Sequence, residues 1–335
     1  TVKKLRLFAY HFSYRGMGGL LGSIGMDGPW DIKRVLGNVP VEADGSAKFR
    51  VPAYTPIAVQ PLDEDGQAMQ LMRSWFTAMP GEVLSCVGCH ERQNRGTPNR
   101  RTLAAHRDAA GITPWHGPVR GFNFAREVQP VLDRYCGGCH HGEPRETGPP
   151  LVDLRGKEII TDWTSGIAGH ASPDVGGKFS TSYVALHGFV RRPGIESNIR
   201  LLTPMEFHAE TTELVQMLRK GHHNVQLDAE AWDRIVTWID LNAPYHGTWS
   251  EIAGEEQVRP LAERARERPR RYAGMEGDPE ALPEPAPGPI QPVLPEPEVD
   301  VPAAVARLPG WPFDAREAAR RQREAGPHEK SVDLG

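Results

Sequence analysis

Every cysteine of this 335-residue chain lies in one of two copies of the pattern Cys-x-x-Cys-His. The copies are Cys86, Cys89 and His90, and Cys136, Cys139 and His140. Two thiols at this spacing can each form a thioether with one vinyl group of the same haem, and the adjacent histidine can then bind the iron. The sequence therefore predicts two covalently bound c-type haems, with His90 and His140 as the proximal iron ligands.

A structural zinc site is the alternative, because paired Cys-x-x-Cys units also bind zinc as Cys₄ or Cys₂His₂. The 46 residues between Cys89 and Cys136 exceed the roughly 15–20 residues that usually separate the two pairs of a zinc ribbon. A histidine directly after each pair also has no necessary role in a zinc site. The spacing therefore favours haem over zinc.

The composition predicts a loop-rich chain with at least one unfolded stretch. Glycine and proline number 35 and 31, and the mean hydropathy is -0.48, which is toward the polar end for a globular protein. Each haem would add apolar surface that the sequence lacks, so we expect the haem-free chain to be poorly structured. The length predicts two or three domains.

Charge and hydropathy argue against nucleic-acid binding and against a membrane-spanning segment. The net charge of -4 provides no basic field for nucleic acid, and no run of about 18 apolar residues predicts a membrane span. The first residue is Thr1, which is typical of a processed or partial chain. Because haem is normally attached outside the cytoplasmic membrane, we expect an exported protein, periplasmic or extracellular.

The N-terminal region reads as β-rich. Residues 5–12 form a short apolar and aromatic run, and residues 57–62 suggest a further strand. Residues 39–51 predict a hairpin, because Asp44-Gly45 is a typical turn between two strand-like runs.

From about residue 121 the apolar residues recur at the spacing of a helix. Apolar residues at positions 124, 128, 131, 132 and 135 mark one face of a helix that leads into Cys136. Residues 211–220 predict a second helix that ends before Gly221, and Asp228 predicts the N-cap of a third.

Together these patterns predict an α+β protein with three parts. Residues 1–120 form a β-rich domain with the first haem, and residues 121–250 form an all-α, cytochrome c-like domain with the second. Residues 251–335 form a charged and proline-rich linker or tail, since eight prolines fall among residues 280–302.

The second axial ligand of each haem is less constrained than the first. For the second haem the candidates are His223 and His222, with His223 ranked first, because the pair follows a helix end inside the same predicted domain. Met217 is the alternative. For the first haem we rank His11, then His116, then His106, and an open position would make that haem catalytic.

Four segments of the sequence resemble hydrazine synthase alpha subunits (their middle and C-terminal regions) and related planctomycete-type multihaem proteins. They are residues 10–19, 73–91, 220–224 and 238–249. The resemblance implies that two histidines bind the second haem in a cytochrome c-like domain, His140 with His222 or His223. In that family a tyrosine four residues after the first motif's histidine binds the active-site haem, whereas this chain has Asn94.

The leading interpretation is a dihaem c-type cytochrome that exchanges electrons with redox partner proteins. The alternative is a haem enzyme, similar to hydrazine synthase or acting otherwise on a small nitrogen or oxygen species at the first haem. A third possibility is a haem-bearing subunit of a homo-oligomer, filament or larger assembly.

Overall fold

The computed structural model describes residues 1–17, 22–26, 31–72, 74–87, 101–144, 151–156, 159–160, 179–193, 203–274 and 276–283. The chain divides into two units, Thr1–Pro295 and Glu296–Gly335, and all described residues belong to the first. Most of the predicted proline-rich segment lies outside the described residues. So do Cys89, His90 and Asn94 of the first haem region.

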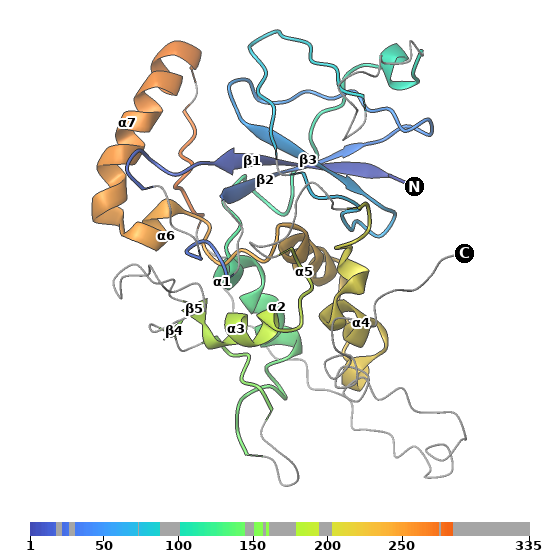
Figure 1. Ribbon diagram of the computed structural model, residues 1–335, viewed down its shortest axis with the longest axis vertical. Coiled ribbons are helices and arrows are strands. Elements are labelled where there is room, and N and C mark those ends of the chain that lie inside the picture. Colours follow the sequence, from blue (N-terminus) through green and yellow to red (C-terminus); the bar gives the residue numbers. More distant parts are fainter. Residues whose placement is uncertain are drawn as a thin grey trace, which may run out of the picture. The chain divides into compact units, whose positions relative to one another are not determined.

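An antiparallel sheet forms the N-terminal part of the structure (Figure 1). Its strands are β1 (Lys4–His11), β2 (Ile32–Pro40) and β3 (Ile57–Leu62), in the order β2-β1-β3. The strands predicted over residues 5–12 and 57–62 are confirmed to within one residue.

The predicted hairpin over residues 39–51 is wrong in its second arm. The turn forms, with Gly45 in a left-handed conformation (φ 82°). Phe49 then makes an isolated parallel bridge to Ala110 instead of pairing with β2. The second arm cannot pair with β2 because both edges of β2 are taken, one by β1 and the other by the bridge from Asn38 to Thr113.

The later part of the chain is mainly helical. Its elements are α1 (Phe124–Glu127), α2 (Gln129–Tyr135), β4 (Ile159–Ile160), β5 (Phe179–Ser180), α3 (Thr181–His187), α4 (Glu213–Arg219), α5 (Ala229–Asp240), α6 (Trp249–Ala253) and α7 (Glu255–Ala273). Single 3₁₀ turns are η1 (Ala104–His106), η3 (Ala209–Thr211) and η4 (His222–Asn224). A small antiparallel sheet followed by helices confirms the α+β class, while the cytochrome c-like domain and the boundaries at residues 120 and 250 stay predictions.

The helices begin and end largely where the sequence indicates. Asp228 caps α5 by accepting a hydrogen bond from the N–H of Ala231 at 2.8 Å, and Gly221 follows α4 with φ 88°. The helix predicted before Cys136 is divided into α1 and α2 at Val128, two residues before Pro130. None of the helices within the described residues combines the length and apolar character that crossing a membrane requires.

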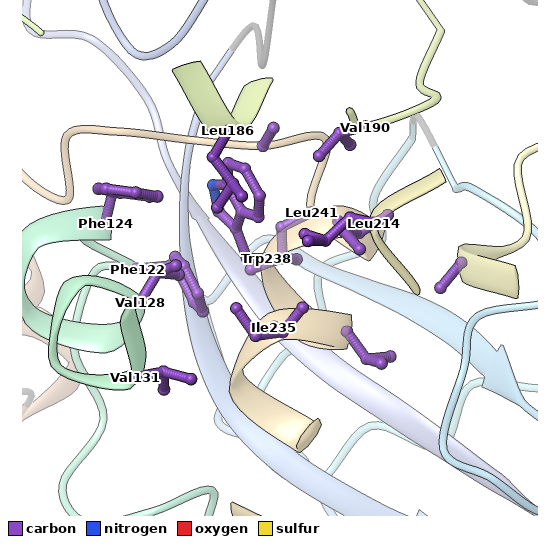
Figure 2. Close-up of a cluster of buried hydrophobic side chains, with 14 of the residues drawn as sticks. Phe122, Phe124, Val128, Val131, Leu186, Val190, Leu214, Ile235, Trp238 and Leu241 are labelled. Carbon is purple, nitrogen blue, oxygen red and sulfur yellow. The ribbon is translucent and has the colours of Figure 1, made fainter. Parts of the chain in front are cut away.

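The largest hydrophobic cluster joins the sheet to the helices. Figure 2 shows Trp238, Ile235 and Leu241 of the α5 region packed among apolar side chains from the α1, α2 and α3 regions. Phe8 of β1 and Ala58 of β3 belong to the same cluster. Residues on both sides of the predicted boundary at residue 120 therefore share one core.

A buried ion pair also crosses from the sheet to the helices. Arg6 Nη1 of β1 lies 2.7 Å from Asp240 Oδ2 at the end of α5, and both side chains are almost fully buried. Gln60 of β3 accepts from the same nitrogen at 3.1 Å and donates to the Asp240 carbonyl at 2.7 Å. Burial raises the pKa of Asp240, and the neighbouring Arg6 opposes that rise.

Two glycines allow a close backbone crossing beside α1. A Cβ atom on Gly121 would lie 1.7 Å from the carbonyl oxygen of Gly247, a distance that no side chain can occupy. The crossing brings the start of α1 against the loop before α6, where Asn123 donates to Glu251 at 2.6 Å.

Candidate haem sites

The second Cys-x-x-Cys-His motif forms one compact turn at the end of α2. The N–H of Cys136 donates to the Leu132 carbonyl at 2.8 Å, so the turn continues directly from the helix. The Cys136 carbonyl then accepts from the N–H groups of Cys139 and His140, at 3.1 and 2.8 Å. This local geometry keeps both thiols and the imidazole within a few residues of a rigid helix end.

No disulfide joins the cysteines that the structure describes, which are Cys86, Cys136 and Cys139. Burial, with Cys139 close by, raises the pKa of Cys136 to about 12. The Cys136 sulfur packs against the main hydrophobic cluster, the apolar environment that a haem edge needs.

A backbone carbonyl orients the His140 ring. The Nδ1 atom of His140 lies 3.2 Å from the Val152 carbonyl oxygen, and the His140 carbonyl accepts from the N–H of Leu154 at 2.9 Å. Because Nδ1–H donates to this carbonyl, the lone pair of the neutral ring is left on Nε2, where a metal binds. Sequence reasoning missed this contact, since a backbone acceptor leaves no residue signature.

The rings of His140 and His222 lie close to each other. Their centroids are 6.0 Å apart and the ring planes differ by 31°. A metal–imidazole bond is about 2 Å long, so two imidazoles on opposite sides of one iron have centroids about 6 Å apart. The described residues of the second site therefore fit a haem that is bound by two histidines.

Burial keeps both rings neutral. It lowers the pKa of His140 and of His222, and the neighbouring His223 lowers each further. The neutral imidazole is the form that binds a metal. Both rings are therefore in a ligand-competent state near neutral pH.

The two adjacent histidines occupy a strained turn after α4. His223 and Asn224 are left-handed, with φ values of 45° and 59°, a conformation that costs of order 1–3 kcal/mol per non-glycine residue. The rings of His222 and His223 are nearly perpendicular, with centroids 4.7 Å apart. The structure thus brings His140, His222 and His223 together, although the sequence ranks His223 first. Met217 packs against the hydrophobic cluster instead.

The first motif begins in a segment with an unusual number of exposed apolar side chains. Trp75 is 50 % exposed and Val83 is 91 % exposed, although both lie within eleven residues of the exposed Cys86. Met79, Leu84 and Val87 are also exposed. A run of uncovered apolar groups beside the first cysteine of this motif suits contact with the face of a haem.

His11, the first candidate for the distal ligand of the first haem, is already engaged by protein groups. Its Nε2 lies 3.1 Å from Tyr14 Oη and 3.2 Å from Glu280 Oε1. Burial lowers the pKa of His11 to about 3. Side chains alternate along a strand, so His11 lies opposite Tyr10, which contacts Trp75 with ring centroids 5.8 Å apart.

His116 is engaged in the same way. Its Nε2 lies 2.7 Å from Asp233 Oδ2, while His106 is exposed at the end of η1. Two of the three histidines considered for the first haem therefore turn Nε2 toward a carboxylate. Their role as ligands stays a prediction.

Within the described residues, no three side chains of His, Cys, Asp or Glu gather in a metal-binding group. A haem iron needs at most two protein ligands, because the four pyrrole nitrogens supply the rest of its coordination.

Comparisons with known proteins relate this chain to hydrazine synthase. Residues 1–91, which include the first Cys-x-x-Cys-His motif, match the family model of the hydrazine synthase alpha subunit middle domain. Hydrazine synthase subunit alpha of Kuenenia stuttgartiensis is 22 % identical over an alignment of 305 positions that covers 72 % of this chain and 36 % of that protein.

These two sequence matches confirm the predicted resemblance to hydrazine synthase alpha. A solved structure of Kuenenia stuttgartiensis hydrazine synthase aligns with 73 % of this chain and 39 % of that chain, at 19 % identity and a TM-score of 0.49. The chain thus spans just over a third of the length of its curated relative. This hydrazine synthase alpha-like character extends beyond residues 1–91, because the sequence alignment covers most of the chain.

Proposed function

We propose that this chain is a dihaem c-type subunit with two unequal haems and hydrazine synthase-like chemistry. One haem attaches to Cys136 and Cys139, with His140 and His222 as the iron ligands. The other attaches to Cys86 and to the second cysteine of its motif, Cys89, with His90 as its proximal ligand and an open position for a small nitrogen species.

The observation that carries the proposal is the 6.0 Å separation of the His140 and His222 rings. A haem bound by two histidines has no free coordination position, so it exchanges electrons and does not bind substrate. Val152 supports this role, because its carbonyl holds the His140 ring in the tautomer that binds iron. When bound, haem supplies one-electron chemistry at the second site and a reactive iron at the first.

Two observations support an open position at the first haem. His11 and His116, the two histidines ranked highest for this position, both direct Nε2 to carboxylates, those of Glu280 and Asp233. The comparisons also favour the enzymatic alternative over electron transfer alone, because the curated relative is by name a subunit of an enzyme. Asn94 is where the family's tyrosine ligand would stand, so we expect the open site to differ in detail from that of the relative.

Carbon monoxide binding to the reduced holo-protein tests the proposal. Haem content is first measured by mass and by the pyridine haemochrome, and we expect two haems per chain. We then expect one equivalent of CO to bind, at the first haem. No binding would contradict the open position and leave electron transfer alone, whereas two equivalents that bind with equal affinity would contradict ligation by His222.

The partners follow from the same resemblance. The relative is one subunit of a larger enzyme by its name, so we propose that this chain also works within an assembly and receives electrons from a redox partner protein. Thioether attachment of haem places the protein outside the cytoplasmic membrane in this proposal. Light scattering on the purified holo-protein tests the homo-oligomeric form of the assembly, and co-purification from the native source tests the form with other subunits.

A further inference from the structure

We propose that the hydrogen bond between Tyr135 and Asp228 sets the separation of the two histidines at the second haem site. This inference rests on the proposed ligation of that haem by His140 and His222. Tyr135 and Asp228 are positioning residues in this proposal, because they act through the segments that carry the ligands.

One carboxylate joins the two segments. Tyr135 Oη donates to Asp228 Oδ2 at 2.7 Å, and Arg134 Nη1 lies 3.3 Å from the same oxygen. The other oxygen, Oδ1, accepts from the N–H of Ala231 at 2.8 Å. Asp228 therefore ties the last turn of α2 to the first turn of α5 through charge-assisted hydrogen bonds.

Each end of this tie lies close to an iron ligand along the chain. Tyr135 is buried and directly precedes Cys136, the first residue of the haem motif. Asp228 follows the histidine turn by a few residues, and Val225 and Leu227 between them pack against the main hydrophobic cluster. The Tyr135–Asp228 hydrogen bond therefore joins the two segments at points only five residues from His140 and six residues from His222.

The turn that carries His222 needs such a constraint, because the adjacent His223 competes for the same position and the backbone of the turn is strained. His223 is adjacent to His222 and its ring lies 4.7 Å away, while the left-handed conformations of His223 and Asn224 are costly. If the segment after the turn were free, relaxation of this strain would move His222 away from the iron position.

The test is competition between His222 and CO at the reduced second haem. Tyr135→Phe keeps the ring and its packing and removes only the hydroxyl. Loss of one charge-assisted hydrogen bond changes an equilibrium constant by about tenfold, so we expect a second equivalent of CO to bind about tenfold more readily. Asp228→Ala should do the same. Asp228→Asn should stay close to the wild type, because its amide oxygen can accept from the Ala231 N–H while its amide nitrogen donates to the Tyr135 hydroxyl.

Tyr183→Phe is the matched control. The Tyr183 hydroxyl donates to the Ala243 carbonyl at 2.7 Å and accepts from the Met26 N–H at 2.9 Å, within the same hydrophobic cluster. It should lower stability without opening the second haem to CO. The inference is overturned if Tyr135→Phe matches the wild type, or if Tyr183→Phe opens the haem equally. A wild-type protein that binds both equivalents of CO with equal affinity overturns the proposed ligation itself.

Discussion

His140 and His222 stand 82 residues apart in the sequence, yet their ring centroids lie 6.0 Å apart. Three local features bring the two rings together. The helix α2 runs directly into the motif that carries His140, the left-handed turn presents His222 after α4, and Asp228 binds the two segments together. A pair of imidazoles at this separation is suited to bind one iron from opposite sides.

The buried ion pair predicts a large stability effect. Asp240→Asn removes the nearer and more buried of the two carboxylates that compensate the fully buried Arg6, the other being Asp233 at 3.8 Å, so the free energy of unfolding should fall by about 3 kcal/mol. Urea unfolding of the holo-protein measures this loss. Asp65→Asn is the control, since Asp65 pairs with Arg219 on the surface and its loss should cost less than about 1 kcal/mol. If both variants lose the same free energy of unfolding, the buried ion pair stabilises the fold no more than a surface pair does, which would contradict this prediction.

The crossing of Gly121 and Gly247 predicts intolerance to a single methyl group. Gly121→Ala would place Cβ 1.7 Å from a backbone oxygen, so the two backbone segments must separate, at a cost of about 3 kcal/mol in unfolding free energy. Gly111→Ala serves as the control, because no atom lies within 4 Å of the point that its new methyl group would occupy. A Gly121→Ala protein as stable as Gly111→Ala would mean that this contact is loose in solution.

His246 predicts a pH dependence of stability. Burial lowers its pKa to about 4, so between pH 6.5 and 4 the unfolded chain binds a proton that the folded chain does not. Stability is therefore lost as the pH falls through this window, by up to about 1.4 kcal/mol per pH unit for this group. His246→Phe should become progressively more stable than the wild type from pH 6.5 down to 4 in urea unfolding. A difference between His246→Phe and the wild type that stays constant with pH would contradict the effect.

Local signals predict much of this fold. The strands β1 and β3, the buried face of α2 and the Asp228 cap follow from alternation, helical period and capping chemistry, which depend on neighbouring residues. The strand β2 is missed because its apolar positions, such as Val35, Leu36 and Val39, do not alternate strictly. The second arm of the hairpin fails because its partner, Ala110, is distant in sequence.

The candidate sites divide in the same way. The Cys-x-x-Cys-His motifs are local and specify haem attachment and the proximal ligands, which stay predictions. The relation of His222 to His140 depends on the turn conformation and on Tyr135, neither of which has a residue signature. The engagement of His11 by Glu280 joins residues 269 positions apart, so no sequence pattern reveals that this histidine is occupied.

Electron paramagnetic resonance of the oxidised holo-protein tests the central claim, ligation of the second haem by His140 and His222, most directly. The wild type should show one low-spin signal typical of two histidine ligands, from the second haem. His222→Ala should convert that signal to high spin, whereas His223→Ala should leave it in place. A low-spin signal that survives His222→Ala and disappears in His223→Ala would contradict the account.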